Sequence, residues 1–172
     1  MAAAPALFAD ECVMGLPNLS ESDAAKVDLE NVLMRFSAGI AEICLRRRIP
    51  FCIKSPWSSR IWMTKQFQSL QKSSHVHFGY TDFCGDGTLW RKRTGLLHGF
   101  VDLGSCCKRC NTRGGICSFS GKRHAQQMGQ CQGVFLTRAA EPYPQKLCRR
   151  VAKAFVASVL SRWCSNLWER LS

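Results

Sequence analysis

The sequence predicts an α/β protein, namely part of an open, doubly wound sheet with flanking helices and a cysteine-rich irregular loop. Three observations predict it. Helical and strand-like segments alternate between residues 20 and 83, only about three strands are visible, and residues 102–136 are rich in Cys and Gly without a regular period. We therefore expect a loose lead-in over residues 1–19 and a single partial α/β domain over residues 20–172, with residues 102–136 as a basic insertion.

The clearest helical segment covers residues 20–48. Ser20 and Asp23 have the spacing of a capping box, acidic residues occupy the first turn, and three arginines close the last turn. Apolar residues recur along this segment at steps of four and three, which predicts one apolar stripe on the helix. Its members are Leu29, Leu33, Phe36, Ile40 and Ile43.

Short apolar and β-rich runs predict the strands. The run "IPFCI" (49–53) is typical of a buried strand, and Pro56 suits the start of a helix that extends to Leu70. The runs "HVHFGYTDF" and "TGLLHGF" favour a second and a third strand. A long helix then begins near Tyr143, and its predicted apolar face consists of Leu147, Val151, Phe155, Val159 and Trp163.

Charge is distributed unevenly along the chain. The net charge is +12. Residues 1–45 carry two Lys or Arg against seven Asp or Glu, whereas residues 46–172 carry 22 against five. A basic body of this size suits an anionic partner such as nucleic acid or a membrane surface, although a merely solvated basic surface is the alternative. No run of about 18 apolar residues occurs, so we expect no membrane-spanning helix.

The chain has eleven cysteines, an odd number. Its first 15 residues have no basic region before their apolar run, and Asp10 and Glu11 interrupt that run, so they do not predict a secretory signal. We therefore expect an intracellular, reducing location, in the nucleus or the cytoplasm, with thiols that are free or bound to metal.

Two motifs carry a resemblance to a known family. The segments "IKSPWSSRIW" and "LWRKRT", within a match over roughly residues 15–156, resemble methyltransferase-like segments of large protist polyproteins, which are similar to DNA cytosine 5-methyltransferases. The resemblance implies a Rossmann-like methyltransferase sheet that uses S-adenosylmethionine. The resemblance places Lys54 at the position of the family's glutamate, and Arg60 matches an arginine of the motif that follows it. Arg91 and Arg93 align with arginines that, in the family, position the nucleophile loop and the flipped base.

The chain also departs from that family. Lysine at position 54 cannot accept a hydrogen bond from the base's amino group as a carboxylate does, and neither a Phe-x-Gly-x-Gly loop nor a Pro-Cys loop is found. The resemblance therefore implies a truncated, inactive methyltransferase-like domain with residual nucleic-acid binding, to which S-adenosylmethionine does not bind in this chain alone. A further hypothesis is that this chain is half of a catalytic domain, which another chain or segment completes.

The cysteine-rich insertion contains a possible metal site. Cys107, Cys110, Cys117 and His124 follow the pattern C-x2-C-x6-C-x6-H, and three thiolates with one imidazole can complete a tetrahedral zinc site. A loop of free thiols is the alternative. The site gives the second functional hypothesis, a small zinc-dependent module that binds nucleic acid or protein on a nonfunctional α/β fragment.

Seven basic residues are candidates for nucleic-acid contact. Three belong to the family motifs, and four lie in the insertion, where a metal-ordered loop can offer cations to phosphates. They are Arg60, Arg91, Arg93, Lys108, Arg109, Lys122 and Arg123.

Overall fold

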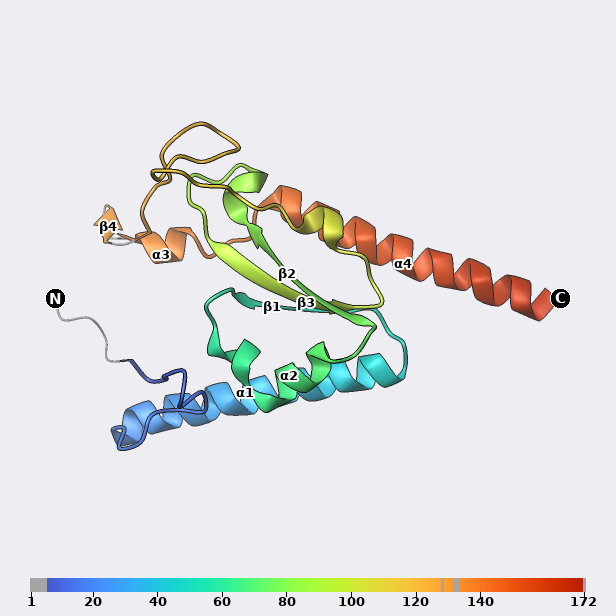
Figure 1. The fold of residues 1–172 in the computed structure, drawn as a ribbon, viewed down its shortest axis with the longest axis horizontal. Coiled ribbons are helices and arrows are strands. Elements are labelled where there is room, and N and C mark those ends of the chain that lie inside the picture. The colour runs from blue at the N-terminus through green and yellow to red at the C-terminus, as the bar shows by residue number, and fades with distance from the viewer. Residues whose placement is uncertain (1–5, 128, 132–133, 172) are drawn as a thin grey trace.

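A small sheet lies between helices in the computed structural model, which describes residues 6–127, 129–131 and 134–171 (Figure 1). The helices are α1 (Glu21–Arg46), α2 (Lys65–Gln71), α3 (Leu136–Ala139) and α4 (Gln145–Leu171), with 3-10 turns η1 (Arg60–Met63), η2 (Phe83–Asp86) and η3 (Gly104–Cys106). The strands are β1 (Phe51–Pro56), β2 (Val76–Asp82), β3 (Arg93–Gly99), β4 (Gln130–Cys131) and β5 (Val134–Phe135).

The main sheet is antiparallel throughout, so the predicted doubly wound, Rossmann-like sheet is wrong. Its strand order is β1-β3-β2, and β3 pairs antiparallel with both neighbours, with Gly99 opposite Phe51 on one side and Val76 on the other. The short segment 83–92 explains the direction of β3, because a parallel return needs a crossover of about a dozen residues or more. β3 thus lies between β1 and β2. The crossover through η1 and α2 connects β1 to β2.

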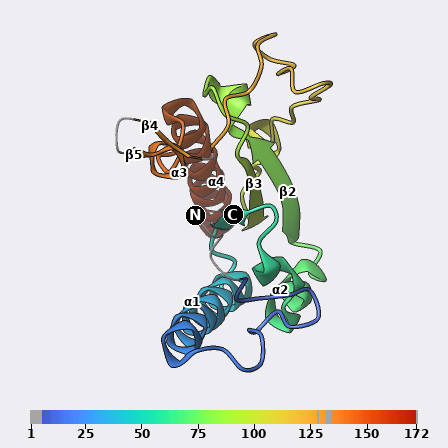
Figure 2. The ribbon, with the colours of Figure 1, turned by 90° about the vertical axis from the view of Figure 1, so that its left-hand side faces the viewer.

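Each face of the sheet carries its own core. Leu97 of β3 packs with Met34 of α1 and Phe67 of α2 in one cluster, and the neighbouring Leu96 packs with Leu103 and with Leu147 of α4 in the other. This alternation follows from the period of two along a strand. Figure 2 shows α1 and α2 on one side and α4 on the other.

The helix α1 forms as predicted, but its apolar stripe lies on the surface. The Ser20 side chain accepts a hydrogen bond from the Asp23 N–H at 3.2 Å, which confirms the cap. The residues that face the core are smaller or less apolar, namely Val27, Asn31, Met34, Ala38 and Ala41. By contrast, the large residues of the predicted stripe are between 45% and 66% exposed.

Two other helical segments differ in part from prediction. The predicted helix after Pro56 is divided at Thr64 into η1 and α2. In α4, Leu147 is buried, but Val159 and Trp163 are exposed, because the second half of this helix extends beyond the sheet (Figure 1). None of the helices in the described residues has a stretch long and apolar enough to span a membrane.

Candidate metal centre

Three thiols and one imidazole gather at the end of β2. Cys84 comes from η2, and Cys110, Cys117 and His124 come from the irregular segment that follows η3. Their ligand atoms all lie within 4.8 Å of one another. The three cysteines are buried and His124 is half-buried, so this group of four is shielded from solvent and can hold a metal ion.

Tight turns in the loop bring its three ligands to one point. The Cys117 N–H donates to the carbonyl of Lys122 at 2.8 Å, and the Gly121 N–H donates to the carbonyl of Cys117 at 2.9 Å. Gly121 has a φ of 66°, a left-handed conformation that glycine adopts without steric cost. The His124 N–H then donates to the Gly115 carbonyl at 3.1 Å, which returns the chain beside Cys110 and Cys117.

The Cys110 sulfur is surrounded by polar groups. The Ser118 N–H and hydroxyl donate to it at 3.4 and 3.5 Å, and the Thr112 hydroxyl lies 3.2 Å away. Burial by itself raises the pKa of Cys110, but these hydrogen bonds and that of Cys84 outweigh it and lower the pKa to about 6. Burial raises the pKa of Cys84. Cys110 is therefore more easily deprotonated than Cys84, and a thiol must be deprotonated to bind a metal.

A buried carboxylate ties Cys110 to the sheet. Asp82, the last residue of β2, accepts the Cys110 N–H at 2.9 Å and both the Nε and Nη2 groups of Arg93, at 3.0 and 3.2 Å. Arg91 donates to the Cys110 carbonyl at 2.9 Å. Both backbone groups of Cys110 are thus held by side chains, one at the end of β2 and one in the segment just before β3, which fixes one ligand relative to the sheet.

A second buried carboxylate ties η2 to α4. Asp86 is paired with the guanidinium group of Arg150 from α4, and Lys108 lies 3.4 Å from the same carboxylate. Lys108 also donates to the Gly85 carbonyl at 2.9 Å. The turn that carries Cys84 is therefore anchored to a helix and to the loop at the same time.

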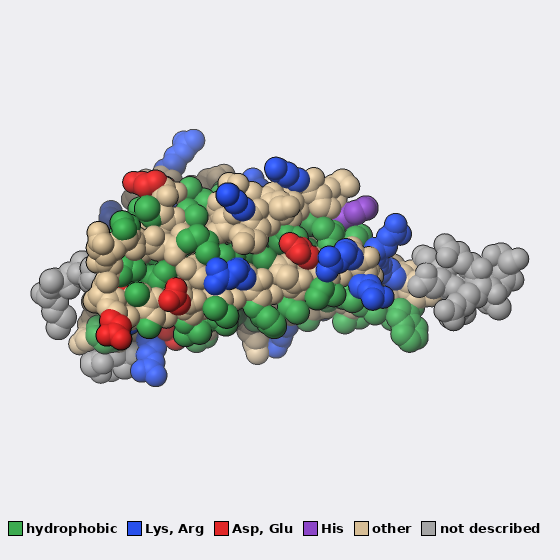
Figure 3. Space-filling view, turned by 90° about the horizontal axis from the view of Figure 1, so that it is seen from below, with side chains coloured by type: hydrophobic (Ala, Val, Ile, Leu, Met, Phe, Trp, Pro, Cys, Tyr) green, Lys and Arg blue, Asp and Glu red, His purple; other side chains and the backbone are tan. Residues whose placement is uncertain are grey.

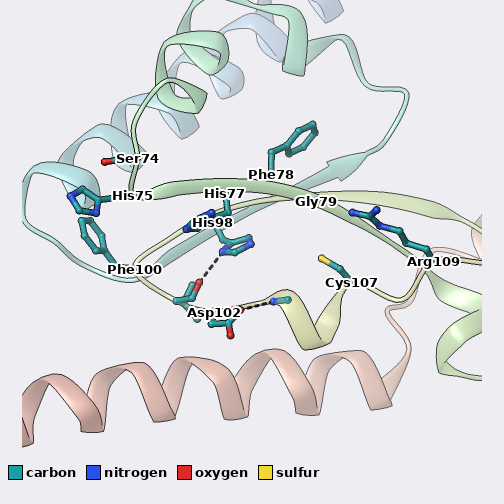
Figure 4. A pocket seen from close by; sticks show the side chains of 12 residues that line it. Ser74, His75, His77, Phe78, Gly79, His98, Phe100, Asp102, Cys107 and Arg109 are labelled. Carbon is teal, nitrogen blue, oxygen red and sulfur yellow. Dashed lines mark hydrogen bonds between the residues drawn. The ribbon is translucent and has the colours of Figure 1, made fainter.

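Cys107 lies outside the group of four. It faces a separate cavity of about 590 Å³, together with His77, His98 and Arg109 (Figure 4). Burial raises its pKa. The structure thus brings together three of the four sequence-predicted ligands, Cys110, Cys117 and His124, and replaces the fourth by Cys84. All nine cysteines whose side chains are described are free thiols.

The candidate nucleic-acid residues fall into two classes. Some are engaged in ion pairs: Arg91 and Arg93 with Asp82, Lys108 with Asp86, and Arg60 with Asp10 at 3.0 Å. The others are exposed to solvent, namely Arg109, Lys122 and Arg123. The guanidinium group of Arg109 stacks over the Tyr80 ring.

Lys54 lies on β1 and contacts an aromatic ring. Its ammonium group lies 4.4 Å from the centre of the Tyr143 ring. Burial, with a smaller contribution from the nearby Lys92, lowers the pKa of Lys54. This contact is a cation–π interaction, which stabilises a partly buried ammonium group.

Sequence reasoning missed Cys84 and both buried carboxylates. The motif "DFCGDG" (82–87) places one aspartate at the end of a β-rich run, and a cysteine and a second aspartate in the glycine-containing turn that follows. This motif is the only sequence signal for them. Comparisons with protein-family models, with curated proteins and with solved structures gave no match, so the resemblance to cytosine methyltransferase-like segments stays a prediction from short motifs.

Proposed function

We propose that this protein is a zinc-stabilised module that binds nucleic acid through the basic loop around its metal centre. The observation that carries the proposal is the convergence of Cys84, Cys110, Cys117 and His124 within 4.8 Å. Cys₃His is one of the common ligand sets of structural zinc, which is four-coordinate and tetrahedral.

The distances between donors support zinc at this position. With a Zn–S bond of about 2.3 Å, two sulfurs of a tetrahedral site lie about 3.8 Å apart. The Sγ atoms of Cys110 and Cys117 are 3.9 Å apart, and the Cys110 Sγ is 3.7 Å from Nε2 of His124. A disulfide would need about 2.05 Å between the sulfurs. The spacing therefore fits two thiolates that share a metal ion.

A structural role is favoured over a catalytic one. A catalytic zinc keeps one coordination position for water or substrate, whereas four protein ligands leave no such position. The loop that supplies three of them has little core of its own, since its exposed residues include Ile116 and Phe119. Metal binding would supply the free energy that orders this segment.

The charge of the loop favours a polyanionic partner. Residues 103–140 contain six Lys or Arg and no Asp or Glu. Of these, Arg109, Arg113, Lys122 and Arg123 are exposed, and Phe119, between them in the chain, is 48% exposed. Cations that contact phosphates beside an aromatic ring that stacks on a base are the usual means of binding single strands.

Reversal of two loop charges tests the nucleic-acid proposal. In zinc-loaded protein, the double variant Lys122→Glu/Arg123→Glu should bind a fluorescent single-stranded oligonucleotide at least about 10-fold more weakly, because each cation lost removes a phosphate contact. The slope of log affinity against log salt should fall by about 2. Fluorescence anisotropy at several salt concentrations measures both quantities.

The matched control carries the same charge change elsewhere. Lys146→Glu/Arg149→Glu reverses two exposed cations on α4 and should change the affinity by less than about 3-fold. Zinc content should equal that of the wild type in both variants. Equal weakening by the two pairs would indicate attraction by net charge alone, and undetectable binding by the wild type would refute the nucleic-acid proposal while leaving the metal centre intact.

A further inference from the structure

The outer face of α1 exposes large apolar side chains along most of the helix. We call this face the α1 stripe; it comprises Leu29, Val32, Leu33, Phe36, Ile40 and Ile43, which are between 45% and 66% exposed. Figure 3, which views the molecule from the side of α1, shows hydrophobic side chains gathered along it. A contiguous patch of this kind is unusual on a monomer and marks an interaction site.

The spacing of the α1 stripe is that of a coiled-coil seam. Leu29, Leu33, Phe36, Ile40 and Ile43 follow one another at steps of four, three, four and three. Two heptads with apolar residues at both seam positions are a surface that packs against another helix. Next to the seam, Gly39 has open space around its missing side chain, so a second helix can approach closely there.

The stripe is not covered by the described parts of its own chain. The lead-in packs on a different face of α1, where the Asn31 side chain donates to the Met14 carbonyl at 2.7 Å and Val27 lies against Gly15. The sheet and α2 pack on the face that contains Met34 and Ala38. The seam is thus left for an external partner.

The charges of the helix indicate which partner fits. Residues 21–34 carry four acidic side chains and one lysine, whereas residues 35–48 carry four arginines and one glutamate. An antiparallel copy of the same helix would place each acidic half beside a basic half. A parallel copy would place like charges together, and an anionic membrane would repel the acidic half.

We propose that the α1 stripe is the interface of a homodimer, in which two copies of α1 pack antiparallel. Because the charge changes sign between Met34 and Arg35, the two-fold axis passes near this point, and Leu33 of one copy faces Phe36 of the second copy. The arrangement is self-complementary both in the spacing of its apolar residues and in its charge. This interface does not depend on the metal centre, because α1 supplies none of the four ligands.

Sedimentation equilibrium of the full zinc-loaded chain under reducing conditions tests the proposal. The wild type should be a dimer at about 100 μM, with a dissociation constant in the micromolar range. Phe36→Glu should raise that constant at least about 100-fold, because it buries an unpaired charge at the centre of the seam. Leu160→Glu is the matched control, since Leu160 is 59% exposed on α4, and it should dimerise as the wild type does.

Charge reversal tests the antiparallel orientation. An acidic variant (Arg46→Glu/Arg47→Glu/Arg48→Glu) and a basic variant (Glu21→Lys/Asp28→Lys/Glu30→Lys) should each dimerise at least about 10-fold more weakly than the wild type, and their mixture should form a heterodimer. Circular dichroism should show native helix content in both. A monomeric wild type at about 100 μM would overturn the proposal, whether or not it binds anionic vesicles, and so would a Phe36→Glu variant that still dimerises.

Discussion

Replacement of Cys84 by serine is expected to reduce the zinc content of the purified protein from about one equivalent to less than about 0.1. The reason is that Cys84 supplies one of four ligands in a closed site, and it is the only ligand outside the loop. Loss of zinc removes the free energy that orders the loop, so the thermal midpoint should fall by at least about 10 °C. Metal analysis after dialysis and a thermal melt measure the two effects.

Cys107→Ser is the matched control for this prediction. Cys107 is three residues from Cys110 in a C-x2-C pair, but its side chain faces the cavity with His77 and His98. Its replacement should leave about one equivalent of zinc and shift the midpoint by less than about 3 °C. Zinc retained by Cys84→Ser and lost by Cys107→Ser would instead support coordination by Cys107.

Replacement of Asp82 by alanine is expected to destabilise the protein by about 3–5 kcal/mol. The carboxylate is fully buried, and its removal leaves the guanidinium group of Arg93 and the N–H of Cys110 without their partner. For a chain of this length, such a loss lowers the thermal midpoint by about 10 °C. It should also weaken zinc binding, because Cys110 loses one of its two backbone anchors.

Two further variants separate the charge from the packing. Asp82→Asn keeps the volume and one acceptor oxygen, so its effect should lie between those of the wild type and the alanine variant. Asp10→Ala breaks the exposed pair with Arg60, which should cost less than about 1 kcal/mol. If Asp82→Ala cost no more than Asp10→Ala, the buried carboxylate would not be an anchor of the metal loop.

The sequence predicted single elements better than their assembly. Ser20 and the acidic first turn identified the start of α1, because capping is a local interaction. The α1 stripe was also visible as a pattern, but periodicity says only that a face is apolar, not which partner covers it. Similarly, β-rich runs located β2 and β3, while their antiparallel pairing depended on the short connection between them.

The metal centre was predicted only in part, because sequence spacing reveals ligands that are close in the chain but not those that the fold brings together. Cys110, Cys117 and His124 lie close together in the chain, so their spacing indicated a site. Cys84 reaches it through the fold: β2 ends beside the loop, and Asp82 and Asp86 hold the two segments together. Arg91 and Arg93, which the family motif suggests as contacts to nucleic acid, also pair with Asp82. Spacing in sequence could not predict those long-range contacts.

X-ray absorption at the zinc edge of the purified, zinc-loaded protein tests the metal centre most directly. We expect a first shell of three sulfur atoms at about 2.3 Å and one nitrogen at about 2.0 Å, with one zinc per chain. A shell of oxygen and nitrogen atoms without sulfur, or zinc that a single dialysis step removes, would contradict a structural site built by Cys84, Cys110, Cys117 and His124.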